Sequence, residues 1–236
     1  MQVVILAGGI GSRMHNHAPA LPKALIPVCN RPFIEYQLDL LATQGLNDIL
    51  ICSGHLGNLI ENHIGNGLKW QVNVRYSREN PDRLLGTGGA LLNALPMLEE
   101  AFFTLYGDSY LPTNYSAIIE AFNRSYNDAI MAVYRNEGQW DTSNVCVENG
   151  MVSLYSKSAP ADQVDHIDYG ITGFHRCHIE AYKDVSMPLD LATIQGNLVE
   201  QGRMRAFEVH DRFYEIGKPE GLAELEAYLK GDLNRS

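Results

Sequence analysis

The chain has 236 residues, of which 45% are hydrophobic and 19% charged, and its formal net charge is −10. This composition is typical of a folded globular protein with room for one large domain, and it excludes a disordered chain. The acidic balance argues against nucleic acid or an anionic membrane as a partner, and no apolar run is long enough for a membrane helix. Four scattered cysteines and a chain start that runs directly into a strand predict a cytoplasmic protein with reduced thiols and no leader peptide.

The first predicted element is a strand at residues 3–6, where a short apolar run indicates burial on both faces of a parallel sheet. The turn that follows, residues 8–11, reads Gly-Gly-Ile-Gly and lets backbone N–H groups come close to a bound oxyanion. Arg13 and Lys23 add cationic donors beside this turn. Together these residues predict a cradle for a polyphosphate.

Two common phosphate loops are excluded by spacing. A Walker A loop ends in Gly-Lys-Ser or Gly-Lys-Thr, and neither triplet occurs in the chain. The dinucleotide fingerprint requires a third glycine three residues after the second, but Met14 stands at that position after Gly11.

Helices and strands then alternate along the first third of the chain. A helix is predicted from Pro32 to a stop at Gly45, followed by a strand at 48–52, a short helix at 59–64 and a strand at 72–76. This alternation favours a parallel sheet covered by helices on both faces. Ligands of such sheets bind outside the carboxyl ends of the strands.

A second glycine cluster, Leu-Gly-Thr-Gly-Gly-Ala at residues 85–90, opens the next predicted helix. Three glycines in four residues exceed what a tight turn requires, so the cluster predicts the close approach of a ligand to this backbone. The strand at 102–105 ends in Tyr-Gly-Asp, which places the carboxylate of Asp108 at a carboxyl end.

The alternation breaks down in the second half of the chain. A helix at 114–122 and a strand at 129–133 precede strand candidates at 145–147, 152–155 and 166–174, which are separated by glycine and polar turns. This pattern predicts a smaller, partly antiparallel lobe. Two amphipathic helices are predicted at 189–199 and 219–229.

The glycine motifs carry a resemblance to a known family. Leu-Ala-Gly-Gly-x-Gly-x-Arg at residues 6–13, with Pro-Lys-x-Leu-x-Pro-Val at 22–28, resembles the signature of the sugar-1-phosphate nucleotidyltransferases. The resemblance extends to Gly217, and the short bacterial members that use heptose 1-phosphate with GTP or N-acetylmuramate 1-phosphate with UTP look most similar. It implies a Rossmann-like three-layer α/β/α sandwich, with a mostly parallel mixed sheet and a small, partly antiparallel sugar-binding lobe.

The resemblance also implies the domain organisation and the reaction. One domain is expected, with a nucleotide-binding part at 1–135, a sugar-binding lobe with C-terminal helices at 136–236 and no β-helix domain. The implied activity is Mg²⁺-dependent transfer of a nucleotidyl group from a nucleoside triphosphate to a sugar 1-phosphate in nucleotide-sugar biosynthesis, by a monomer or homodimer. GTP with heptose 1-phosphate is the first choice. The alternatives are UTP or CTP with another sugar phosphate or a phosphocholine-like acceptor, or a non-catalytic nucleotide-binding regulator.

The resemblance assigns residues to the nucleotide side of the site. Arg13 is expected to neutralise the leaving pyrophosphate, and Lys23 the reacting phosphates. The expected nucleotide contacts are Leu6, Ala7, Gly8, Gly9, Gly11, Glu79, Gly86, Thr87 and Gly88. Glu79 is the expected reader of the base; its acceptor-only carboxylate suits an edge that offers donors, which leaves guanine, uracil and cytosine open.

Metal and acceptor residues are assigned in the same way. Asp108 is implied to hold Mg²⁺ with Glu215, at a position where the family usually carries Asp. The expected sugar-phosphate contacts are Asn144, Lys157, Asp168 and Gly170. Ser156 stands where the family has the Glu of a Glu-Lys pair. The departures at Ser156 and Glu215 keep the regulator among the alternatives.

Overall fold

The computed structural model describes residues 1–9, 21–80, 83, 85–156 and 158–233. Three predicted site residues lie outside this part of the chain, namely Gly11, Arg13 and Lys157. Among the described residues, none of the helices combines the length and the apolar character that crossing a membrane requires.

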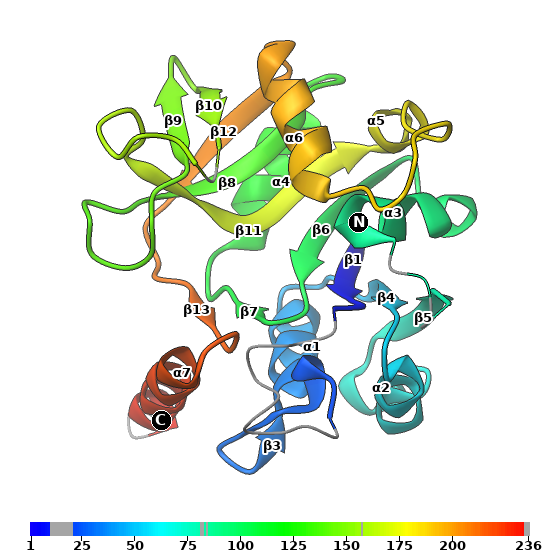
Figure 1. The fold of residues 1–236 in the computed structure, drawn as a ribbon. Coiled ribbons are helices and arrows are strands. Elements are labelled where there is room, and N and C mark those ends of the chain that lie inside the picture. Colours follow the sequence, from blue (N-terminus) through cyan, green and yellow to red (C-terminus); the bar gives the residue numbers. More distant parts are fainter. Residues whose placement is uncertain (10–20, 81–82, 84, 157, 234–236) are drawn as a thin grey trace.

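The centre of the fold is a nine-stranded mixed sheet in the order β5-β4-β1-β6-β11-β8-β12-β10-β9. Its strands are β1 (Gln2–Ala7), β4 (Asp48–Ser53), β5 (Asn73–Arg78), β6 (Ala101–Tyr106), β8 (Ala129–Arg135), β9 (Val145–Glu148), β10 (Met151–Tyr155), β11 (His166–His175) and β12 (Met204–Val209). Figure 1 shows β1 between β4 and β5 on one side and β6, β11 and β8 on the other.

The order of the strands creates a switch point beside β1. The chain passes from β1 to β4 and β5, which are parallel to it, and then returns to β6 on the opposite side of β1, again in parallel. The connection that follows β1 therefore leads to one side of the sheet, while β6 lies on the other side of β1. This reversal leaves a crevice at the carboxyl ends of β1 and β6. β11 then enters antiparallel between β6 and β8, and β9 and β10 continue the same sheet in antiparallel pairings.

Helices cover both faces of the sheet. One face packs against α1 (Phe33–Thr43), α2 (Gly57–Ile64) and α4 (Tyr115–Asn123). The other packs against α3 (Gly86–Asn93), α5 (Arg176–Glu180) and α6 (Leu191–Glu200). Val3 and Ile5 point into the first of these cores and Val4 into the second, because successive side chains of a strand alternate. The predicted three-layer arrangement around a mixed sheet is confirmed.

Short elements connect these helices and strands. They are η2 (Lys23–Leu25), β2 (Pro27–Val28), β3 (Arg31–Pro32), η3 (Leu68–Trp70), η4 (Leu95–Met97), β7 (Ser109–Tyr110) and β13 (Tyr214–Glu215). The last helix, α7 (Pro219–Leu233), packs on β13 and β2 through a separate small core, and Figure 1 shows it standing away from the main sheet.

Two elements differ from the sequence-based predictions. β12 was not predicted, because its central side chains are only partly buried and show no regular alternation. The helix predicted from residue 189 begins at Leu191, since the side chain of Asp190 caps it by accepting from the N–H of Ala192.

A buried glutamine holds the turn that carries Asp108. Gln37 lies on the buried face of α1 and is 1% exposed. Its Nε2 donates to the carbonyl oxygens of Tyr106 at 2.8 Å and Ser109 at 2.7 Å, on either side of Asp108. The same turn continues into β7, which pairs with β13 so that Ser109 lies opposite Glu215. Gln37 therefore helps to bring the two predicted metal ligands into one place.

Replacing Gln37 with Met keeps the volume of the side chain but leaves both carbonyl groups without this donor. We expect Gln37→Met to lower the free energy of unfolding by about 1–3 kcal/mol, because buried acceptors lose their partner. Urea titration at pH 7 measures the change. Gln201→Met, at an exposed position after α6, is the matched control and should change stability by less than about 0.5 kcal/mol. Equal losses in the two variants would contradict the bracing role.

A buried histidine makes the fold sensitive to acid. His178 in α5 is 3% exposed; its Nδ1 accepts from the N–H of His175, so its Nε2 donates to the carbonyl of Asn127 at 2.9 Å. Burial lowers the pKa of His178 to about 4. Between pH 6.5 and 4 the unfolded chain therefore binds a proton that the folded chain does not, so stability falls as the pH falls through this window.

We expect His178 to account for about 2 kcal/mol of stability lost between pH 7 and pH 5. Glutamine carries no titrating charge, so His178→Gln should show a correspondingly smaller loss over the same interval. Urea titrations at both pH values give the free energy of unfolding, and the difference between them gives its slope with pH. The exposed His210 provides a control, and His210→Gln should retain the wild-type slope. A slope unchanged in His178→Gln would refute this origin of the acid sensitivity.

Candidate functional site

The site opens where β1 and β6 end side by side. The N–H of Gly107, just after β6, donates to the carbonyl oxygen of Leu6 at 3.0 Å. A Cβ atom at residue 107 would lie 2.9 Å from that oxygen, so only glycine allows the two strand ends to come this close. A cavity of about 490 Å³ opens beyond them, at the switch point of the sheet.

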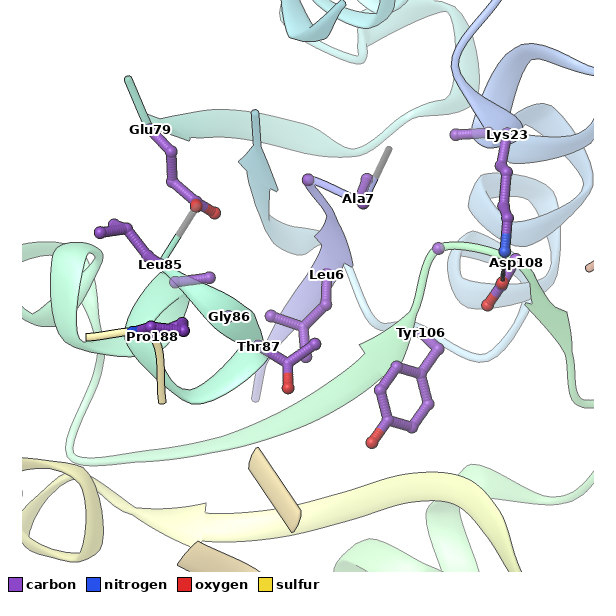
Figure 2. Close-up of a pocket in the computed structure, with 15 residues that line it drawn as sticks. Leu6, Ala7, Lys23, Glu79, Leu85, Gly86, Thr87, Tyr106, Asp108 and Pro188 are labelled. Carbon is purple, nitrogen blue, oxygen red and sulfur yellow. Dashed lines mark hydrogen bonds and ion pairs between the residues drawn. The ribbon is translucent and has the colours of Figure 1, made fainter. Parts of the chain in front are cut away.

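Most of the predicted nucleotide-side residues line this cavity. They are Leu6, Ala7, Gly8, Gly9, Lys23, Glu79, Gly86 and Thr87, and the predicted metal ligand Asp108 lines the cavity with them. Figure 2 shows that Lys23 and Asp108 meet at one end of the cavity, while Glu79 and Leu85 lie at the opposite end. The cavity therefore has a charged end and a separate end that carries one carboxylate.

At the charged end, Lys23 Nζ lies 2.8 Å from Asp108 Oδ2. η2 directs Lys23 into the cavity because its other two residues, Ala24 and Leu25, are buried in the core. The two side chains are 26% and 29% exposed, so solvent and ligands can reach both. The sequence predicted roles for both residues, but only the fold shows that they form an ion pair.

Glu215 lies beside this pair. β13 pairs with β7, and the N–H of Ile216 donates to the carbonyl oxygen of Asp108 at 2.9 Å. Partial desolvation, followed by the charges of Asp108 and Asp141, raises the pKa of Glu215 to about 7, although solvent still reaches its side chain. Asp108 thus lines the cavity, and the backbone of Glu215 lies beside it across the β7–β13 pair.

The carboxylates of Asp108 and Glu215 fit Mg²⁺. A hard divalent cation is usually held by one or two carboxylates and completes its octahedron with phosphate oxygens and water. In the described part of the chain no group of three or more His, Cys, Asp or Glu residues is suited to a metal ion, so a closed site made only of protein ligands is not formed there. Two carboxylates would suit a cation whose remaining ligands are phosphate oxygens and water.

At the other end, Glu79 packs against Gly8. Its Oε1 would lie 2.9 Å from a Cβ at residue 8, which explains why Gly8 is glycine. Burial raises the pKa of Glu79, and the hydrogen bond from the N–H of Leu85 offsets only part of that shift. The carboxylate is therefore held in place by the chain while one of its edges faces the cavity.

The second glycine cluster lines the cavity and also contacts another segment of the chain. The N–H groups of Gly88 and Gly89 donate to the carbonyl oxygen of Leu189 at 2.9 and 3.0 Å. Gly86 has a φ of +77°, and a Cβ there would lie 2.4 Å from the same oxygen. Gly86 and Thr87 line the cavity, whereas the N–H of Gly88 is directed at Leu189. The sequence predicted the close approach but attributed it to a ligand alone.

The predicted acceptor-side residues are bonded to one another. Asp168 Oδ1 accepts from the N–H of Gly170 at 3.0 Å, and Oδ2 accepts from Tyr155 Oη at 3.3 Å. Asn144 Oδ1 in turn accepts from the N–H of Asp168 at 2.9 Å. Gly170 has a φ of +98° and lies where the pairing of β11 with β8 shifts register. These bonds fix the shape of β11 next to Tyr155 and show how the three residues are held.

A second cavity of about 460 Å³ adjoins the first. It is lined by Gly86, Thr87, Tyr106, Pro188 and Asp190. The first four also line the first cavity, so the two are continuous. In Figure 2 the hydroxyl of Tyr106 points away from the Lys23–Asp108 pair. The sequence analysis did not single out Tyr106, Pro188 or Asp190, since their proximity depends on packing α6 beside α3.

Comparisons with known proteins agree with this architecture. The sequence model of the nucleotidyl transferase family matches residues 2–143, more than half of the chain. The chain is 34% identical over 110 residues, 46% of each protein, to D-glycero-alpha-D-manno-heptose 1-phosphate guanylyltransferase of Aneurinibacillus thermoaerophilus. It is 35% identical over 121 residues to N-acetylmuramate alpha-1-phosphate uridylyltransferase of Neisseria meningitidis, a match that covers 51% of this chain and 52% of the relative. The matched region thus spans about half the length of these two curated relatives.

Structural similarity extends over nearly the whole chain. The crystal structure of HddC from Yersinia pseudotuberculosis superposes with a TM-score of 0.77 and 25% identity, covering 97% of this chain and 99% of that one. The chain therefore belongs to the nucleotidyl transferase family, which confirms the resemblance to sugar-1-phosphate nucleotidyltransferases that its motifs indicate.

Proposed function

We propose that the protein transfers a nucleotidyl group from a nucleoside triphosphate to a sugar 1-phosphate, producing a nucleotide sugar and pyrophosphate. The observation that carries this proposal is the cavity at the β1/β6 switch point, with Lys23, Asp108 and Glu215 at one end and Glu79 at the other. The charged end suits phosphates, and the Glu79 end suits the hydrogen-bond donors of a base. The guanylyltransferase and uridylyltransferase relatives support the same reaction class.

The proposed chemistry is an in-line displacement. An oxygen of the sugar phosphate attacks the α-phosphorus, and the bond from that phosphorus to the bridging oxygen of the β-phosphate breaks as pyrophosphate leaves. The attacking oxygen is already anionic, so no proton transfer is required. Such transfers depend on positioning and on charge stabilisation.

The chain's own residues divide these tasks. The backbone at residues 6–9 and at Gly86 and Thr87 holds the nucleotide, and Lys23 contributes positive charge beside the reacting phosphates. Mg²⁺ held by Asp108 and Glu215 would supply Lewis-acid neutralisation of phosphate charge. Arg13 and Lys157 are proposed, from the family motif alone, to neutralise further phosphate charge.

For the substrates, we propose GTP with heptose 1-phosphate. Guanine presents N1–H and N2–H₂ side by side, which matches the acceptor-only carboxylate of Glu79. The guanylyltransferase relative supports this choice. UTP with N-acetylmuramate 1-phosphate is the second candidate, because the uridylyltransferase relative matches with similar identity and the N3–H of uracil can also be read by a carboxylate.

Pyrophosphate release tests the proposal directly. GTP, UTP, CTP, ATP and dTTP are each combined, with Mg²⁺, with a panel of hexose, heptose and amino-sugar 1-phosphates and with phosphocholine. We expect release that requires one nucleotide and one sugar phosphate together, with the highest kcat/KM for GTP and heptose 1-phosphate. Binding of a triphosphate without release for any acceptor would instead identify a nucleotide-binding regulator.

Separate substitutions distinguish the two partners of the ion pair at the charged end. We expect Lys23→Met and Asp108→Asn each to lower kcat on the order of 10²–10³-fold, because each removes a preorganised charge at the reacting phosphates. Mn²⁺ binding without nucleotide, measured by isothermal titration calorimetry, separates their roles. Asp108→Asn should lose this binding, whereas Lys23→Met should retain or strengthen it, since an ammonium group no longer competes for Asp108 Oδ2.

Lys230→Met is the control for these variants. Lys230 is exposed on α7, and its ion-pair partner among the described residues is Glu226. This variant should keep both kcat and Mn²⁺ affinity within twofold of the wild type. Wild-type turnover in Lys23→Met or Asp108→Asn at saturating substrates would show that the charged end does not serve the reaction.

A further inference from the structure

Residues 187–190 form a strap that lies across the start of α3. The carbonyl oxygen of Leu189 accepts from the N–H groups of Gly88 and Gly89, and the N–H of Leu189 donates to the carbonyl oxygen of Leu85 at 2.8 Å. Three backbone hydrogen bonds therefore attach the strap to the loop that lines the nucleotide cavity. The glycines permit this contact, since side chains at their positions would meet the strap.

Side chains add a second connection between the loop and the strap. Thr87 Oγ1 donates to Asp190 Oδ1 at 2.8 Å and accepts from the N–H of Leu191 at 2.8 Å. The same Asp190 oxygen accepts from the N–H of Ala192 at 3.2 Å and caps α6. The hydroxyl of Thr87 is thus built into the first turn of α6, while Thr87 itself lines both cavities.

α6 carries this connection to the acceptor side. Gln195, one turn further along the helix, is 1% exposed. Its Nε2 donates to Thr172 Oγ1 at 3.0 Å and lies 3.5 Å from Asp168 Oδ2. Thr172 and Asp168 belong to β11, in which Asp168 fixes the turn at Gly170. A continuous series of contacts therefore runs from the nucleotide loop through α6 to β11.

We propose that Thr87 and Asp190 are positioning residues that couple nucleotide binding to acceptor binding. A nucleotide seated on Gly86 and Thr87 orders the Thr87–Asp190 bond, which fixes the start of α6 and, through Gln195, the Asp168 region of β11. Asp190 also lines the second cavity, which adjoins the first beside Tyr106. This inference rests on the proposed transferase function, because it assigns the second cavity and β11 to the acceptor.

The coupling predicts a specific energetic signature. In the wild type, saturating nucleotide should lower the KM for the acceptor about fivefold or more, the usual lower range for coupled sites. Loss of the Thr87–Asp190 bond should remove this effect. The KM for the nucleotide, measured at low acceptor concentration, should change by less than about twofold. If the bond were purely structural, its loss would lower the melting temperature but would not raise the acceptor KM selectively over the nucleotide KM.

Two pairs of variants isolate the bond. Asp190→Ser keeps a capping hydroxyl for α6 but is too short to reach Thr87, whereas Asp190→Asn keeps both the cap and the acceptor oxygen. Thr87→Val removes the hydroxyl with little change of shape, and Thr87→Ser restores it. We expect Asp190→Ser and Thr87→Val each to raise the acceptor KM about fivefold. Asp190→Asn and Thr87→Ser should behave like the wild type.

The double variant gives the decisive comparison. If the two residues act through one bond, Thr87→Val with Asp190→Ser raises the acceptor KM no further than either change alone. If each residue contacts the acceptor independently, the two effects multiply, and the coupling is overturned. The same conclusion would follow if Asp190→Asn were as impaired as Asp190→Ser, because the shared bond would then not explain the loss.

Hydrogen exchange provides a readout that needs no acceptor. GTP with Mg²⁺ should slow amide exchange at residues 191–196 in the wild type and in Thr87→Ser, but not in Thr87→Val. Unchanged protection in Thr87→Val overturns the coupling even when turnover is normal. Failure of every triphosphate to bind the wild type overturns the proposed function, whereas nucleotide binding with unchanged protection in Thr87→Val overturns the coupling alone, so the two failures are distinguishable.

Discussion

The parallel pairing of β1 with β6 is the constraint on which the site depends. The chain builds β4 and β5 on one side of β1 and returns to place β6 on the other, so the carboxyl ends of β1 and β6 meet where the connecting helices diverge. Gly107 lets these ends approach until its N–H bonds the carbonyl oxygen of Leu6. From that point the chain presents Asp108 at one end of the cavity, while Gly8 packs against Glu79, which lies at the other end.

Close approach of backbone to backbone explains much of the glycine usage around the cavity. Gly8 makes room for the carboxylate of Glu79, and Gly88 and Gly89 make room for the strap at residue 189. Glycine therefore lets distant segments of the chain approach each other, and in this way residues 85–89 are bonded to the segment that precedes α6.

The charges at the cavity are arranged differently from the acidic balance of the whole chain. The chain carries a net charge of −10, yet Lys23 is held at the cavity by Asp108 rather than dispersed in solvent. Glu215 stands beside Asp108 with a raised pKa, because partial desolvation and neighbouring carboxylates disfavour a further negative charge there. Neighbouring carboxylates of this kind suit a divalent cation, which would offset the negative charge that the chain itself carries.

Local patterns in the sequence predicted the class of the fold, most of the elements and most of the residues that line the cavity. The apolar runs, helix stops and glycine spacings are local signals, so strand β1 and the position of Asp108 at the end of β6 follow from neighbouring residues alone. Only the tertiary structure decided which distant groups meet: Gln37 with the turn around Asp108, Lys23 with Asp108 itself, and Thr87 with Asp190. These contacts join residues 69 to 103 positions apart, and no local pattern encodes such a distance, because packing of helices on the sheet sets it.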